Sequence, residues 1–123
     1  RKPINPGDTP AIRAVLDCWA KGDEARGWAK YWALIYGATA DRLATDPVLA
    51  ERCRLVRFED LCDRPLETVT EVAQHLSLPD DQATLAALAE GFHRPNYYKP
   101  SFSDAERAAI LEETAVVAGR FGY

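Results

Sequence analysis

The segment Phe92–Lys99 carries the side chains best suited to binding an anion. Its sequence, FHRPNYYK, brings Arg94, Lys99 and His93 together with two tyrosines and has no helical periodicity. Guanidinium and ammonium groups donate charge-assisted hydrogen bonds to phosphate oxygens, and neighbouring tyrosine rings shield such contacts from water. These residues are suited to a loop that grips a phosphate. The alternative is a surface loop whose tyrosines pack against the body of the domain.

Other kinds of chemistry lack their sequence signatures. The three cysteines, Cys18, Cys53 and Cys62, form no CxxC pair, so neither a disulfide framework nor a structural zinc site is indicated. This cysteine usage fits a reducing, cytoplasmic compartment. There is also no GxxxxGK[ST] sequence, whose backbone amides and lysine would cradle a phosphate.

Length and charge narrow the possible partners. A chain of 123 residues, 47% of them hydrophobic, is the size of one globular domain and can bury a core without disulfides. Because the net charge is −4, there is no broad positive field for nucleic acid or anionic lipid, and neither is expected as a partner. No apolar run is long enough to span a membrane, so a soluble protein is expected. The first residue is Arg1, which predicts a processed chain or a piece of a longer one.

Five amphipathic helices are expected to position these side chains. Apolar residues recur at helical spacing in about five stretches, at residues 12–21, 23–45, 65–76, 81–90 and 103–121. Asp23 is expected to cap the second helix and Pro65 to begin the third, while Ser103 and Glu106 have the spacing of a capping box before the last. The stripe that the last helix is expected to bury is Ala108, Leu111, Ala115 and Ala118.

One strand is predicted, at residues 54–58, where RLVRF is rich in β-forming residues. A lone strand leaves its backbone donors and acceptors unpaired. Either residues 55–58 pair with strands outside this chain, or the interpretation as a strand is wrong.

Three groups of motifs resemble, in the same order, the sulfotransferases that use 3′-phosphoadenosine-5′-phosphosulfate (PAPS). RLVRFEDLCDRPLETVTEVAQHLSLPDD, at 54–81, is similar to the family's V-R-Y-E-D-L strand, Pro-containing turn, helix and F-L-G-L-P. Upstream, RAVLDCW and WAKYWALIY look like its R-A-V-x-x-S-W helix and tryptophan-bearing successor. Downstream, SFSDAERAAILEETAVVAGRFGY is similar to its L-S-x-E-E-R, final helix and L-G-Y. The resemblance covers about residues 11–123.

The resemblance implies an α/β fold. The chain would be the helix-rich C-terminal portion of a P-loop-like parallel-sheet sulfotransferase, with about five helices and one strand. The family holds the phosphosulfate in a lysine-bearing, glycine-containing loop after its first strand, and no PKSGTT-like sequence occurs here. Residues 11–123 are therefore expected to form a partial domain whose partner is the N-terminal half of the same domain, and residues 1–10 an irregular lead-in.

The resemblance also places residues in a nucleotide site. Phe58 takes the position of an aromatic residue that lies by the adenine; it can stack on a purine but has no hydroxyl. Cys18 aligns with the serine that binds the 3′-phosphate, and Pro10 stands where the family has an arginine. A thiol is a weaker phosphate ligand than a hydroxyl, and proline carries no charge. Arg13 is a candidate replacement cation, with a solvated surface arginine as the alternative.

Two further assignments follow from the resemblance. Arg94 and Lys99 align loosely with the basic loop that closes over the cofactor, although the family's RKG triplet is missing. Arg1-Lys2-Pro3 with Thr9 offers a second register for the 3′-phosphate motif. No residue is nominated as catalytic, because the general base and the cations on the leaving phosphate usually come from the other half of the domain.

The implied reaction moves a sulfuryl group from PAPS to a hydroxyl or amine of a small-molecule or glycan acceptor, leaving 3′,5′-adenosine diphosphate and using no metal. This chain alone is expected to be inactive. The alternative is a non-catalytic helical interaction domain on a degenerate sulfotransferase scaffold, which would expose an apolar patch to a partner. A third possibility is a related nucleotide or sugar kinase, since fold alone does not fix chemistry.

Overall fold

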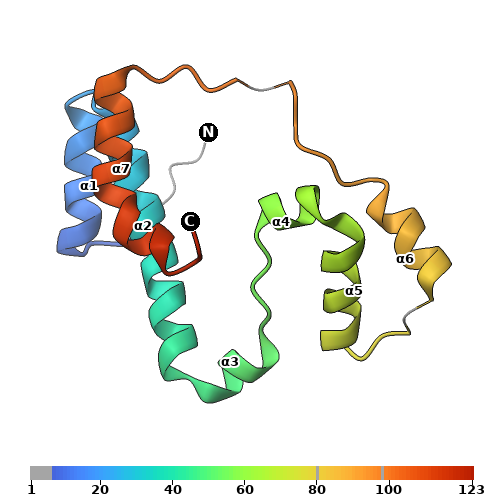
Figure 1. The fold of residues 1–123 in the computed structure, drawn as a ribbon. Helices are drawn as coiled ribbons and strands as arrows, with labels where there is room; N and C mark the ends of the chain where they lie inside the picture. The colour runs from blue at the N-terminus through green and yellow to red at the C-terminus, as the bar shows by residue number, and fades with distance from the viewer. Residues whose placement is uncertain (1–6, 80, 98) are drawn as a thin grey trace. The chain divides into compact units, whose positions relative to one another are not determined.

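The computed structural model describes residues 7–79, 81–97 and 99–123, and this part of the chain contains helices and no strand (Figure 1). The helices are α1 (Pro10–Ala20), α2 (Glu24–Thr45), α3 (Pro47–Arg52), α4 (Phe58–Asp63), α5 (Pro65–His75), α6 (Gln82–Ala89) and α7 (Asp104–Gly119). They belong to two compact units. Unit 1 comprises Arg1–Asp46 and Ser101–Tyr123, and unit 2 comprises Pro47–Pro100.

The expected α/β fold with a parallel sheet is wrong, because the described residues form no strand. Residues 53–57 have no regular secondary structure, and Phe58 already begins α4. The described residues offer this segment no second strand to take its backbone hydrogen bonds, so extended pairing stabilises nothing here. Glu59 and Asp60 in the first turn of α4 instead favour a helix, since carboxylates complement the positive end of the helix dipole.

Unit 1 is built from α1, α2 and α7, and α2 packs against both of the others (Figure 1). Ile12 and Val15 are the buried residues of α1. Gly27 lets α2 pack closely against Trp19 of α1, because a Cβ atom placed at Gly27 would lie 2.4 Å from the Trp19 ring. The predicted cap of α2 is confirmed, since the Asp23 side chain accepts from the backbone N–H of Arg26 at 3.3 Å.

The last helix, α7, begins as predicted but turns a different face inward. Ser103 and Glu106 form the expected capping box. The predicted buried stripe is wrong at three of its four residues: Ala108 and Ala115 are exposed and Leu111 is 66% exposed, whereas Ala118 is half-buried and Ala109 is the buried residue. Ion pairs set the orientation of α7, because Glu113 must face α2 to reach its two cationic partners there, Arg26 and Lys30.

Unit 2 contains α3 to α6, with α5 packing against both α4 and α6. Pro65 begins α5 as predicted. The Thr68 side chain is buried, and its hydroxyl donates to the backbone carbonyl of Asp60 at 3.1 Å, which fixes α5 against α4. Helices α3 and α4 were not expected from the sequence.

Part of the predicted lead-in, residues 1–6, lies outside the described part of the chain, as do Asp80 and Tyr98. Among the described residues, none of the helices combines the length and the apolar character needed to cross a membrane.

Candidate functional site

The five residues assigned to a nucleotide site divide between the two units. Phe58, Arg94 and Lys99 belong to unit 2, and Arg13 and Cys18 belong to α1 of unit 1.

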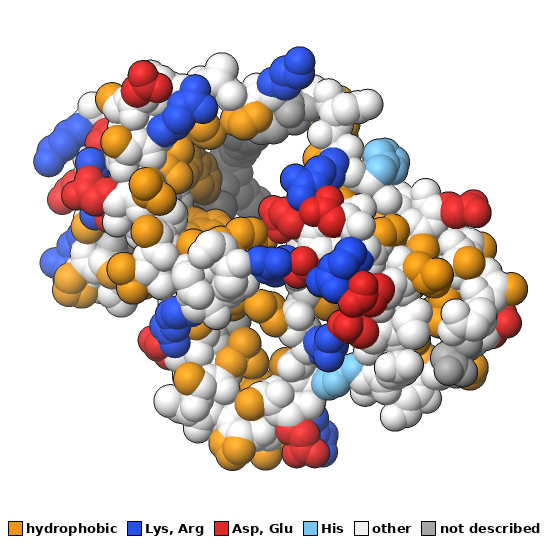
Figure 2. All heavy atoms as spheres, viewed as in Figure 1, with side chains coloured by type: hydrophobic (Ala, Val, Ile, Leu, Met, Phe, Trp, Pro, Cys, Tyr) orange, Lys and Arg blue, Asp and Glu red, His pale blue; other side chains and the backbone are white. Residues whose placement is uncertain are grey.

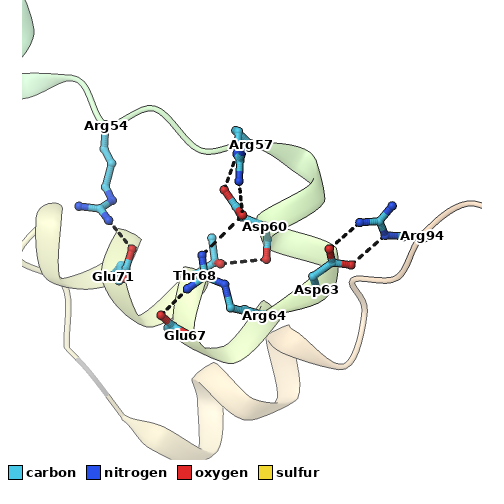
Figure 3. Close-up of polar contacts among 9 residues, drawn as sticks. All are labelled: Arg54, Arg57, Asp60, Asp63, Arg64, Glu67, Thr68, Glu71 and Arg94. Carbon is cyan, nitrogen blue, oxygen red and sulfur yellow. Dashed lines mark hydrogen bonds and ion pairs between the residues drawn. The ribbon is translucent and has the colours of Figure 1, made fainter. Parts of the chain in front are cut away.

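Helix α4 carries one of the expected residues, Phe58, and the carboxylate partner of another, Arg94. Phe58 is its first residue and is 53% exposed. Asp63 is its last residue, and its carboxylate accepts two hydrogen bonds from Arg94, from Nε at 2.8 Å and from Nη2 at 2.5 Å (Figure 3). At about 1.5 Å of rise per residue, the two ends of α4 are about 7.5 Å apart along its axis. The Arg94 guanidinium is thus fixed to the helix that carries the Phe58 ring.

The Asp63–Arg94 pair is charged and accessible to solvent. The hydrogen bonds from Arg94 lower the pKa of Asp63 from its usual 3.8, so the carboxylate is ionised at neutral pH. The Arg94 side chain is 62% exposed and the Asp63 side chain is 52% exposed. Water and salt therefore screen the attraction, and a competing anion can reach the guanidinium.

The other arginines of this region also have carboxylate partners. Arg57 donates to Asp60 from Nε at 2.7 Å and from Nη2 at 2.8 Å, which lowers the pKa of Asp60. Arg64 bridges Asp60 and Glu67 along the helices, and Arg54 pairs with Glu71 (Figure 3). Asp60 thus acts structurally, holding Arg57 with its side chain and Thr68 with its backbone carbonyl.

Basic and acidic side chains are also intermixed over the visible surface (Figure 2). On the face that Figure 2 shows, basic and acidic side chains lie next to one another rather than separating into areas of one sign. Any anion binding by unit 2 would therefore rest on individual cations such as Arg94 and not on a positive field.

The segment before α7 has the exposure expected of a binding loop. His93 and Lys99 are exposed, and Tyr97 is 89% exposed. The alternative of tyrosines packed against the body is wrong for Tyr97. Tyr98, the second tyrosine of that prediction, lies outside the described residues.

The α1 candidates have local partners instead. The Arg13 Nε lies 2.8 Å from Asp8, and the Arg13 side chain is 63% exposed, as for a surface arginine. Cys18 is half-buried, and its Cβ would lie 3.3 Å from a Cβ added at Gly27, so it faces α2. Pro10 begins α1.

In the second register for the 3′-phosphate motif, the hydroxyl group of Thr9 already caps helix α1. The Thr9 hydroxyl accepts from the backbone N–H of Ile12 at 3.3 Å and caps α1. Arg1, Lys2 and Pro3 of that register lie outside the described residues.

Unit 1 also contains a small open hollow of about 230 Å³. It is lined by residues of α1, α2 and α7, namely Ala11, Ala14, Lys30, Ala33, Leu34 and Glu113. Lys30 Nζ and Glu113 Oε2 are 2.8 Å apart, and Arg26 Nη1 binds the other Glu113 oxygen at 2.5 Å. The hollow is smaller than most ligand sites, at about 300–1,000 Å³, and its charges neutralise one another. It therefore favours no ligand charge.

The sequence patterns did not identify Asp63 as part of this region. They indicated only an acidic residue at the start of a helix, whereas in the structure Asp63 is the partner of Arg94, 31 positions further along the chain. Within the part of the chain that the structure describes, no group of His, Cys, Asp and Glu side chains is arranged to hold a metal ion. In comparisons with known proteins, the chain matches no protein-family model, no curated protein and no solved structure.

Proposed function

We propose that this chain is the C-terminal portion of a PAPS-dependent sulfotransferase, with Phe58 and Arg94 in its nucleotide site. The first support is the order of the motifs across about residues 11–123. The observation that carries the site is that Phe58 and Arg94 are both exposed and are joined through α4, at the segment similar to the V-R-Y-E-D-L motif. An aromatic ring can stack on a base and a guanidinium can bind a phosphate, and both groups are attached to α4, Phe58 directly and Arg94 through Asp63.

Each residue has a defined part in this proposal. The Phe58 ring stacks on the adenine, Arg94 donates to a phosphate of the nucleotide, and Lys99 adds a second cation. In the reaction, an acceptor oxygen or nitrogen forms a bond to sulfur while the bond between sulfur and the bridging phosphate oxygen breaks. The acceptor proton leaves to a base, and 3′,5′-adenosine diphosphate is released. The chain has no phosphosulfate loop, so its own residues bind and orient the nucleotide and do not perform the chemistry.

Isothermal titration of the full-length protein with 3′,5′-adenosine diphosphate tests this proposal. We expect the Phe58→Ala, Arg94→Ala double variant to bind at least about 10-fold more weakly, since a hydrogen bond to a charged group contributes about 1.5–3 kcal/mol. Arg107→Ala is the matched control, because Arg107 is also 62% exposed and lies near an aspartate, Asp104. Undetectable binding by the wild-type protein overturns the proposed function. Binding that survives the double substitution overturns the site.

A second candidate function is a helical interaction domain that binds a partner and no nucleotide. The observation that favours it is that α7 exposes two large apolar side chains, Leu111 at 66% and Val116 at 83%. Large exposed apolar side chains mark surfaces that associate with other molecules when they form a continuous patch. The same titration separates the two candidates, because a domain of this second class has no affinity for 3′,5′-adenosine diphosphate.

A further inference from the structure

The Asp63–Arg94 pair links an irregular segment to a helix. Residues 92–97 follow α6 without regular secondary structure, and Arg94 connects them to the last residue of α4. The pair spans 31 positions of sequence. The pair therefore holds the Arg94 side chain of this exposed segment in one position.

The geometry of the pair leaves part of the guanidinium available. An arginine carries five N–H donors in a planar fork. Asp63 takes one from Nε and one from Nη2. The Nη1 atom makes no hydrogen bond to the residues that the structure describes, and with the second N–H of Nη2 it forms the outer edge of the fork. A phosphate can accept two parallel hydrogen bonds from that edge while Asp63 keeps the inner one.

We propose that Asp63 is a positioning residue that presents the outer edge of Arg94 to a phosphate group of the nucleotide. This inference rests on the proposed function and adds a residue to it. The physical reason is preorganisation: immobilising a side chain as flexible as arginine weakens binding by about 2- to 12-fold, and a side chain already fixed avoids that loss.

The Asp63 carboxylate also repels the incoming phosphate. Across about 6 Å of water, two unit charges reduce affinity by about threefold, and physiological salt screens part of this effect. Asp63 fixes both the arginine rotamer and the segment that carries it, so positioning outweighs repulsion. Removing the carboxylate is therefore expected to weaken binding, although it removes a negative charge near an anion.

The test compares affinities for 3′,5′-adenosine diphosphate among variants of the full-length protein at about 0.15 M salt. Asp63→Asn should bind up to about 4-fold more weakly, which is the largest loss of positioning, about 12-fold, divided by the relief of repulsion, about threefold. Asp63→Glu keeps the charge and can still pair with Arg94, so it should bind like the wild type. Asp63→Asn combined with Arg94→Ala should bind no more weakly than Arg94→Ala alone, and up to about threefold more tightly, because only the repulsion by Asp63 is then left to remove. Glu67→Gln, which removes a carboxylate paired with Arg64, is the control and should change nothing.

The outcomes separate this inference from the proposed function. If the wild type binds, Arg94→Ala weakens binding and Asp63→Asn does not, the positioning role is wrong and the nucleotide site stands. If Asp63→Asn weakens binding equally in the Arg94→Ala background, Asp63 acts on the fold and the inference is also wrong. If the wild type does not bind, both proposals fall. Equal thermal unfolding midpoints for wild type and Asp63→Asn exclude a loss of folded protein as the cause.

Discussion

Units 1 and 2 are stabilised in different ways. In unit 1, long helices bury Ile12, Val15 and Phe121, and aromatic rings such as Trp19 and Trp28 contact one another with centroids 4.8 Å apart. In unit 2 the helices are shorter, and the buried residues are small or few in number: Thr68, Ala73, Leu85 and Ala89. Arginine–carboxylate pairs also join its segments, and their side chains are more exposed than the Glu113 carboxylate, 17% exposed, that joins α7 to α2 in unit 1.

This difference in packing and ion pairing affects how easily the contacts within each unit can rearrange. Close packing resists change because displaced side chains lose many contacts at once. Exposed ion pairs are weak and exchange partners readily. Ligand-binding segments are commonly drawn from the less stable parts of a protein. The proposed nucleotide residues Phe58 and Arg94 therefore lie in the unit whose contacts a ligand can most easily replace.

The largest expected effect in this comparison is that of Gly27→Ala on unit 1. The added Cβ would lie 2.4 Å from the Trp19 ring, so α1 and α2 must separate or the ring must move. Overpacking of this kind lowers the free energy of unfolding by about 1–3 kcal/mol. Tryptophan fluorescence during urea unfolding of the chain measures it in unit 1, because all three tryptophans lie there.

Gly37→Ala is the matched control in the same helix. A Cβ at Gly37 would lie 3.7 Å from Val117 Cγ2, an ordinary contact. Replacing a glycine inside a helix by alanine stabilises it by about 0.5–1 kcal/mol. Equal unfolding midpoints for the two variants would show that the Trp19–Gly27 approach does not limit packing.

Local signals in the sequence predicted much of the helical framework. Asp23, Pro65 and the Ser103–Glu106 box act on their own first turns, so the neighbouring residues suffice to predict them. The strand at 54–58 required a partner strand that no local pattern can supply, and the described residues contain none.

Contacts between distant residues could not be predicted in the same way. The inward face of α7 is set by Glu113, whose partners Arg26 and Lys30 are 87 and 83 positions away. The candidate site shows the same limit, since Arg94 and Lys99 were singled out by residue type and Phe58 by the family resemblance, while Asp63 was not singled out at all. Side-chain type identifies which residues can bind a phosphate, but only the fold identifies which carboxylate holds the arginine.

A smaller effect is expected from Ser103→Ala, which removes a cap in unit 1. The Ser103 hydroxyl accepts from the backbone N–H of Glu106 at 3.3 Å, and the Glu106 carboxylate accepts from the backbone N–H of Ser103 at 2.7 Å. Loss of such a cap lowers the free energy of unfolding by about 1 kcal/mol. Ser101→Ala, two residues earlier and outside the box, should leave the fluorescence-detected midpoint unchanged. A Ser103→Ala midpoint equal to that of Ser101→Ala would show that the box does not stabilise α7.

The smallest expected effect is the acid response of the ion pairs, and it differs between the units. In unit 1, hydrogen bonds from Lys30 and Arg26 lower the pKa of Glu113 from 4.5. In unit 2, hydrogen bonds from Arg57 and Arg94 lower the pKa values of Asp60 and Asp63 from 3.8. A carboxylate whose folded pKa is lowered contributes stability that is complete above its unfolded pKa and is lost as the pH falls through the folded one.

Unit 1 should therefore begin to weaken below about pH 4.5, and the pairs of unit 2 below about pH 3.8. Urea midpoints from tryptophan fluorescence follow unit 1 as the pH is lowered, and the arginine Nε–H signals of Arg57 and Arg94 in NMR spectra follow unit 2. Glu113→Gln, which cannot lose a charge, should reduce the acid response of the fluorescence midpoint and leave the Arg94 signal unchanged. If the Arg94 signal instead changes at the higher pH, the Asp63 pair is weaker than its two short hydrogen bonds imply, and the contrast between the units does not extend to their titration.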